Sequence, residues 1–231
     1  MRQGAAMVVQ VSANEIAKPV PSQLNELVRQ DALWSELKYR CGSKLFGEAE
    51  PADYVYQIRE GAIRSYKRLS DGRRQIGAFH LPGDILAVEN CKVHRFTAEA
   101  IVDTIVWFAK RRSLFARLAK GDILAANHVR DLVTRTLEHI ENHLLLLGRQ
   151  KSLEKVAAFL LEIDRRLGQP EVMVLPMTRR DIADYLGTTL ETVSRALSSL
   201  QEERILSFQG TSHRKIVLHD RSKLAQRATS A

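Results

Sequence analysis

The sequence is short of several residue types, and each shortage excludes a class of protein. Its 231 residues include two cysteines, too few for a disulfide framework or for a four-cysteine iron–sulfur cluster within one chain. With 12 glycines and 6 prolines, it is neither collagen-like nor low in complexity. Its longest apolar run, residues 156–161, falls far below the ~18 residues that a membrane span needs. We therefore expect a globular protein of a reducing compartment, the cytoplasm, with a short N-terminal arm.

The composition that remains is ordinary for one or two globular domains. Hydrophobic residues make up 45% of the chain and charged residues 27%, with a formal net charge of +8. A modest basic excess permits a polyanionic partner such as DNA but does not establish one. We find no glycine-rich phosphate loop and no nucleophile–base arrangement, so we predict no catalytic residues and no enzyme.

The pattern between residues 53 and 110 is that of short strands. Apolar segments alternate with turn residues such as Gly61, Asp71-Gly72 and Pro82-Gly83, where glycine tolerates positive φ. Two more strands are expected on either side of Asp103. Closely spaced strands of this kind predict a small β-sandwich or barrel.

From residue 122 to residue 147 the periodicity becomes helical, and Gly148 is expected to cap the helix. Apolar residues at spacings of 4, 3, 4 and 3 average 3.5, the repeat of a coiled-coil seam. Such a seam can pack on its own domain or pair with a second copy, and we favour pairing. The predicted dimer interface consists of Val133, Leu137, Ile140, Leu144 and Leu147.

The most informative segment is residues 177–197. Thr178 with Asp181 three residues later predicts a near capping box, and Gly187 predicts the end of that helix. Thr188 or Thr189 then caps a second helix, which completes a helix-turn-helix layout. A hairpin formed by residues 205–208 and 215–218 is expected to follow.

The residues of the second predicted helix divide into an inner apolar face and an outer polar face. Its outer face is predicted to contact DNA bases through Leu190, Glu191, Ser194 and Arg195. In a major groove, arginine pairs with guanine, and glutamate accepts from cytosine N4. The alternative is an ordinary surface ion pair between Glu191 and Arg195. Predicted contacts to the DNA backbone, including two in a wing at the hairpin, are Thr178, Arg180, Thr189, Thr192, Ser198, Arg214 and Lys215.

These motifs resemble the CRP/FNR superfamily of bacterial transcription regulators. The segment T-R-R-D-I-A-D-Y-L-G-T-T-L-E-T-V-S-R-A-L (178–197) is similar to the family's helix-turn-helix, and residues 72–84 are similar to the β-roll of its FixK-type members. The resemblance implies an α+β fold with an N-terminal double-stranded β-helix (jelly-roll), a long dimerisation helix and a C-terminal winged helix-turn-helix. The expected boundaries are 1–30 for the arm, 31–120 for the β-roll, 121–148 for the dimerisation helix and 149–231 for the DNA-binding domain.

The same resemblance implies a function. It implies a homodimer, mainly an activator, that binds a palindrome near TTGAT-N4-ATCAA upstream of genes for low-oxygen respiration or nitrogen fixation. RNA polymerase is a further expected partner, contacted through Asp71, Gly72 and Arg73. An exposed hairpin tip without a partner is the alternative for these three residues.

Departures from the family pattern argue against its known cofactors. The N-terminal arm has no cysteine, so we expect no iron–sulfur cluster. Residues 86–89 and the Arg95-Phe96 pair do not fit a cyclic nucleotide, and we predict no cofactor and no metal. The runner-up hypothesis is a regulator gated by a small ligand or haem, and a third is an enzyme or signalling adaptor that uses the β-roll.

Four other residues receive structural interpretations. Cys41 and Cys91 are expected in the core. His139 and His143 flank Glu141, but the glutamate is one position too late for a metalloprotease helix, so both histidines are expected to be solvated.

Overall fold

The computed structural model describes residues 8–10, 35–88, 91–211 and 213–229. The chain forms two compact units. The first contains residues 1–69 and 77–137, and the second contains residues 70–76 and 138–231. Among the described residues, no helix combines the length and the apolar character needed to cross a bilayer. The predicted N-terminal arm lies mostly outside the described residues, except for strand β1 (Val8–Gln10).

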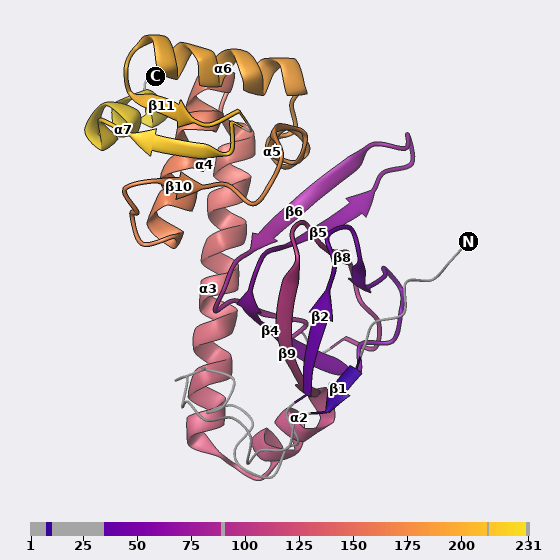
Figure 1. Cartoon of the computed structure of the whole chain (residues 1–231). Helices are drawn as coiled ribbons and strands as arrows, with labels where there is room; N and C mark the ends of the chain where they lie inside the picture. The colour runs from indigo at the N-terminus through magenta and orange to yellow at the C-terminus, as the bar shows by residue number, and fades with distance from the viewer. Residues whose placement is uncertain (1–7, 11–34, 89–90, 212, 230–231) are drawn as a thin grey trace. The chain divides into compact units, whose positions relative to one another are not determined.

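The first unit is built on two antiparallel sheets (Figure 1). One sheet has the order β1-β2-β9-β4-β7, with β2 at Ser35–Tyr39, β4 at Tyr54–Glu60, β7 at Ile85–Leu86 and β9 at Thr104–Lys110. The other has the order β3-β8-β5-β6, with β3 at Lys44–Phe46, β5 at Ile63–Arg68, β6 at Arg74–His80 and β8 at Thr97–Ala100. The predicted strand-rich sandwich is confirmed.

The core of the first unit follows from the alternation of apolar side chains along its strands. Ile58, Ile63 and Val106 are almost fully buried there, together with the small residues Ala98 and Ala100. Helix α2 (Arg111–Ala119) adds a second cluster, in which Leu114 packs with Val55 and Ala109. These buried side chains form the core of a domain whose sequence contains few long apolar runs.

One turn of this unit requires glycine. Gly61, between β4 and β5, has φ +88°, and a Cβ there would lie 2.5 Å from the Asp103 carbonyl oxygen. Left-handed backbone and close approach of another chain segment are the two conditions that select glycine. The turn at Gly72, with φ +85°, meets the first condition only, because a Cβ there would lie in open space.

The cysteines do not lie where the sequence predicted. Cys41 is exposed, and its thiol contacts the carbonyl oxygen of Ile101 at 3.2 Å. Cys91 is half-buried. Both expectations of a core position are therefore wrong, because neither cysteine lies on the inward face of a strand.

Helix α3 (Ile123–Gly148) is the long helix predicted from the 3.5-residue repeat. Its seam residues Val133, Leu137, Ile140 and Leu144 are 54–68% exposed. Leu147, the last seam residue, is half-buried and lies against Gly187, 3.5 Å from the position that a Cβ would occupy there. Gly148 is the last helical residue and does not have the positive φ expected of a cap.

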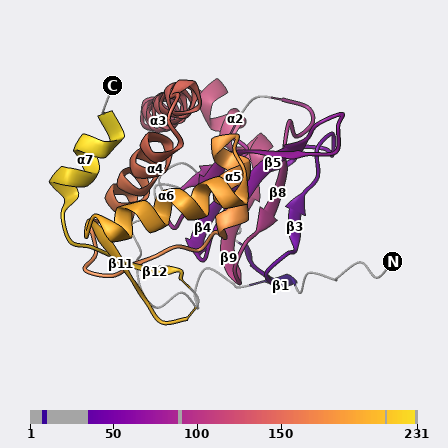
Figure 2. The same ribbon diagram turned by 90° about the horizontal axis from the view of Figure 1, so that it is seen from above.

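The second unit contains the C-terminal helices and a small sheet. Its elements are α4 (Ser152–Arg166), β10 (Met173–Val174), α5 (Arg179–Leu186), α6 (Leu190–Glu202), β11 (Leu206–Gln209), β12 (Lys215–Leu218) and α7 (Arg221–Thr229). Within this unit α4 lies next to both α6 and α7 (Figure 2). The sheet has the order β10-β12-β11, so β10 extends the predicted hairpin to three strands.

An ion pair fixes the last helix of this unit. The buried carboxylate of Asp164 on α4 accepts two hydrogen bonds from the Arg221 guanidinium, at 2.8 and 3.0 Å. Arg221 also donates to the Pro170 carbonyl. A buried carboxylate is stable only when it is paired in this way, so the contact fixes the start of α7 against α4.

Candidate nucleic-acid interface

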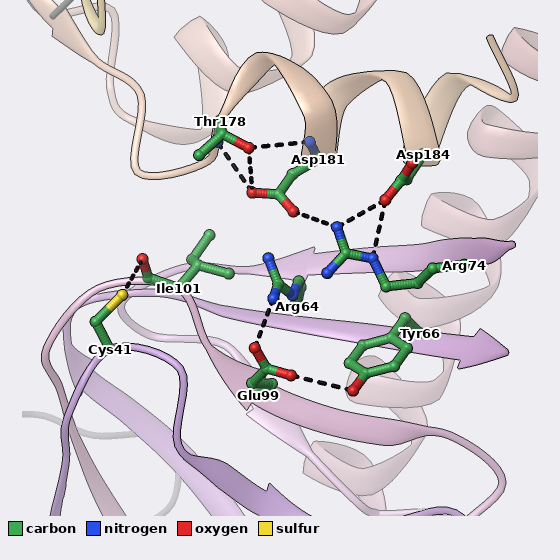
Figure 3. A network of polar contacts seen from close by, with 9 residues as sticks. All are labelled: Cys41, Arg64, Tyr66, Arg74, Glu99, Ile101, Thr178, Asp181 and Asp184. Atoms are coloured by element: carbon green, nitrogen blue, oxygen red, sulfur yellow. Dashed lines mark hydrogen bonds and ion pairs between the residues drawn. The ribbon is translucent and has the colours of Figure 1, made fainter. Parts of the chain in front are cut away.

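The first helix of the candidate site begins with a complete capping box. Thr178 Oγ1 accepts a hydrogen bond from the Asp181 backbone N–H, and the Asp181 carboxylate accepts from the Thr178 backbone N–H at 3.0 Å (Figure 3). The Thr178 hydroxyl also donates to that carboxylate at 2.8 Å. These bonds satisfy N–H groups that have no partner inside the helix, so they set where α5 starts.

The capping box leads to a test of stability. Replacing Thr178 with Ala is expected to lower the free energy of unfolding by about 1 kcal/mol, because the Asp181 N–H loses its acceptor. Thr178→Ser keeps the hydroxyl and is expected to stay close to the wild type. Urea denaturation of both variants measures the difference. Equal stability of the alanine and serine variants would show that the cap contributes nothing.

Sequence and structure agree on the turn and on the second helix. Gly187 adopts φ 62° and ψ 41°, the left-handed conformation predicted for the end of α5. Of the two candidate caps, Thr189 is the N-cap of α6, and its hydroxyl accepts from the Thr192 N–H. The inner face of α6 is buried and consists of Val193, Ala196, Leu197 and Leu200.

The outer face of α6 presents polar groups to solvent. Glu191 and Arg195 are exposed, whereas Leu190 and Ser194 are half-buried. Hydrogen bonds from its own backbone N–H and from the Thr189 hydroxyl lower the pKa of Glu191. Glu191 is therefore ionised at neutral pH and can only accept hydrogen bonds. The Arg195 guanidinium lies 3.5 Å from the Thr192 hydroxyl.

Arg179, the first residue of α5, joins this face, although no sequence motif assigned it a role. Its Nη1 lies 3.3 Å from Ser194 Oγ, and its guanidinium lies over the Phe208 ring at 5.3 Å from the centroid. Phe208 belongs to β11 and also meets the His213 ring edge-on. The two residues are 15 positions apart in the sequence, and no local rule relates them, so the contact could not be predicted.

The residues predicted to contact the DNA backbone differ in their exposure. Thr178, Arg180, Thr189, Ser198 and Lys215 are exposed, and Thr192 and Arg214 are half-buried. The hydroxyls of Thr178 and Thr189 already serve as helix caps. Residue 212 of the wing turn lies outside the described residues, whereas His213 next to it has φ 52°.

The predicted polymerase-contact segment carries an internal ion pair. Asp71 and Arg73 are joined at 2.7 Å, and their side chains are 48% and 77% exposed. The neighbouring Arg74, which received no role from the sequence, bonds within the second unit to Asp181 at 2.7 Å and to Asp184 at 2.6 Å (Figure 3). Burial alone would lower the pKa of Arg74, but these two carboxylates raise it.

His139 and His143 of α3 are not solvated, which corrects the expectation. His143 is buried, stacks on the Tyr185 ring with centroids 3.9 Å apart, and donates from Nε2 to the Tyr185 carbonyl. His139 Nδ1 lies 3.1 Å from the Glu162 carboxylate. Their spacing of four residues places both on the side of α3 that meets α4 and α5, a packing that no local motif indicates.

Residues of the other ligand hypotheses can be placed in part. Arg95 and Phe96 are exposed, and Glu89 lies outside the described residues. His80 Nε2 on β6 lies 2.7 Å from the Ser65 hydroxyl. Within the described parts of the chain, no group of three or more His, Cys, Asp or Glu is placed to hold a metal ion.

Two family models match the chain. Residues 36–121 match the cyclic nucleotide-binding domain, and residues 154–227 match the Crp-like helix-turn-helix domain. The first match covers the strands of the first unit except β1, and the second covers the helices and sheet that hold the candidate interface.

Relatives extend this similarity over most of the chain. The nitrogen fixation regulation protein FixK of Azorhizobium caulinodans is 39% identical over 219 residues, which cover 93% of this chain and 84% of that protein. The fumarate and nitrate reduction regulatory protein of Yersinia pestis is 31% identical, over 94% of this chain and 88% of that protein. The solved structure of FixK2 from Bradyrhizobium japonicum has a TM-score of 0.80 and 52% identity, and covers 86% of this chain and 98% of its own.

These relatives are transcription regulators and not enzymes. The matches place the β-roll, the capped helix α5 and the two-faced helix α6 in a single known architecture. The chain belongs to the CRP/FNR family of DNA-binding transcription regulators and is of the FixK/FNR type.

Proposed function

We propose that the protein is a homodimer that recognises an inverted-repeat DNA site through the outer face of α6. The observation that carries this proposal is that α6 has two distinct faces. One is buried and apolar, and the outer one contains Glu191, Ser194 and Arg195. Leu190 adds an apolar contact for a thymine methyl group. An ionised carboxylate and a guanidinium one turn apart match the donor and acceptor edges of G·C pairs.

The exposed seam of α3 supports the dimer. Val133, Leu137, Ile140 and Leu144 form an apolar stripe along one side of the helix and are 54–68% exposed in a single chain. Exposed apolar stripes of this period are stable when they pair with a second helix. Pairing would hold two copies of α6 about 34 Å apart, one turn of B-DNA, and make the second half-site contact intramolecular.

The relatives indicate the biological setting of the proposal. Proteins named for nitrogen fixation regulation and for fumarate and nitrate reduction match most of the chain. We infer a site near TTGAT-N4-ATCAA, activation of genes for low-oxygen respiration or nitrogen fixation, and action in the cytoplasm without an iron–sulfur cluster. The exposed pair Asp71 and Arg73, with Gly72 between them, is the surface we propose for RNA polymerase.

Selection of bound sequences from a random DNA pool tests the proposal. The full-length protein is used in air without added ligand, after its absorbance spectrum has been recorded. Enrichment of an inverted repeat with a G·C pair in each half-site is the expected result. Enrichment of single half-sites alone would contradict the dimer, and binding that appears only with haem or a small ligand would favour the gated alternative.

A further inference from the structure

On the outer face of α6, Ser194 contacts a side chain of the preceding helix. Ser194 is half-buried, whereas Glu191 and Arg195 on the same face are exposed. Its hydroxyl lies 3.3 Å from Nη1 of Arg179, a residue of the preceding helix. We propose that Arg179 is a positioning residue for specificity, which orients the Ser194 hydroxyl toward one class of base edge. This inference rests on the proposed function of α6.

The contact defines the polarity of the serine. A guanidinium only donates hydrogen bonds, so Ser194 Oγ must accept from Arg179. One lone pair is thereby engaged, and the single O–H of the serine is left to donate away from Arg179. A serine without this neighbour can donate or accept with equal ease, and for that reason it discriminates poorly between bases.

The direction of the remaining hydrogen bond selects the base. Thymine O4, guanine O6 and N7, and adenine N7 accept hydrogen bonds in the major groove, whereas cytosine presents the N4 donor. A serine held as a donor therefore favours an acceptor edge and disfavours cytosine. The distance of 3.3 Å lies just beyond the usual N–H···O range of about 2.7–3.2 Å, so the contact contributes orientation more than stability.

The wing sheet supports Arg179 from the other side. The guanidinium lies over the ring of Phe208 on β11, at 5.3 Å from its centroid, and the capping box fixes the backbone immediately before it. His213 of the wing turn meets the edge of the same ring, with centroids 5.2 Å apart. A planar guanidinium stacks on an aromatic face and keeps its donors in a fixed fork, which a lysine ammonium cannot do. Phe208 thus restricts the Arg179 donor to the direction of Ser194.

A double-mutant cycle on the full-length protein tests the proposal. Wild type, Arg179→Ala, Ser194→Ala and the double variant are titrated with the selected palindrome and with every single base substitution of one half-site. Each single variant is expected to lose about three- to tenfold of discrimination at the same base pair, the size of one oriented hydrogen bond. The double variant is expected to lose no more than Ser194→Ala alone, because the arginine acts through the serine.

Three further variants separate positioning from simple charge and from folding. Arg179→Lys keeps the positive charge and is expected to lose the discrimination while it retains most of the affinity. Phe208→Leu is expected to lose part of the discrimination at the same base pair. Arg180→Ala removes the adjacent exposed arginine of α5 and is the matched control, which is expected to weaken all sequences alike.

Three results would overturn the inference. They are uniform weakening by Arg179→Ala that adds to the effect of Ser194→Ala, loss of discrimination at a different base pair, or full discrimination in Arg179→Lys. If Arg179→Ala does not fold, as judged by circular dichroism, the lysine and leucine variants decide. A wild-type protein without any sequence preference would instead refute the proposed function of α6, which is a separate and recognisable outcome.

Discussion

The Ile140→Glu variant is expected to be monomeric and to bind the palindrome about 10²- to 10⁴-fold more weakly than the wild type. Ile140 lies in the middle of the α3 seam and is 56% exposed in the single chain. In a symmetric pair each glutamate would meet apolar side chains and its own copy, so two charges would be buried without partners. Loss of the dimer removes the intramolecular second contact to DNA, whereas the face of each α6 remains intact.

Sedimentation at low micromolar concentration and fluorescence anisotropy with full and half operators measure this effect. Asn142→Glu is the matched control, because residue 142 is exposed and lies about 200° around the helix from Ile140. It adds the same charge and is expected to leave both the dimer and the affinity unchanged. An intact dimer of Ile140→Glu would show that the seam is not the interface. Equal affinity of both variants for the half operator would confirm that α6 is undisturbed.

The Arg195→Ala variant is expected to lose about 1–3 kcal/mol of binding free energy and to relax the preference at one G·C pair in each half-site. Arg195 is exposed on the outer face of α6, and the Thr192 hydroxyl at 3.5 Å is a weak partner that a base edge can replace. A guanidinium donates two parallel hydrogen bonds to guanine O6 and N7. Alanine donates neither hydrogen bond, so the binding free energy is expected to decrease for DNA that carries the guanine.

Titration with operators that differ at each position of one half-site gives the measurement. Arg195→Lys serves as the control for charge, since it retains the attraction to phosphates but not the bidentate geometry. We expect the lysine variant to recover affinity for all sequences and only part of the preference. The contrary result is that Arg195→Ala weakens binding equally for every sequence and that Arg195→Lys restores full affinity. That result would identify Arg195 as a phosphate contact and would contradict its assignment.

The buried pair formed by His143 and Tyr185 shows what a sequence pattern does not contain. Nothing in the sequence around His143 distinguishes a solvated helix histidine from one that stacks on the first helix of the DNA-binding motif. Cys41 shows the reverse case, because a cysteine is usually buried but this one is exposed. In both cases the surroundings are supplied by residues far along the chain, and composition does not identify them.

Features that depend on neighbouring residues could be predicted from the amino-acid sequence alone. The strands of residues 54–110, the capping box of Thr178 and Asp181, the left-handed Gly187 and the two faces of α6 all follow from periodicity and from hydrogen bonds within a few residues.

Contacts between side chains on different helices and strands became known only from the folded chain. Arg179 contacts Ser194 and Phe208, and Arg74 contacts Asp181 and Asp184, because packing of the second unit brings these distant segments together. The energy of such contacts depends on geometry and burial, which no local pattern specifies.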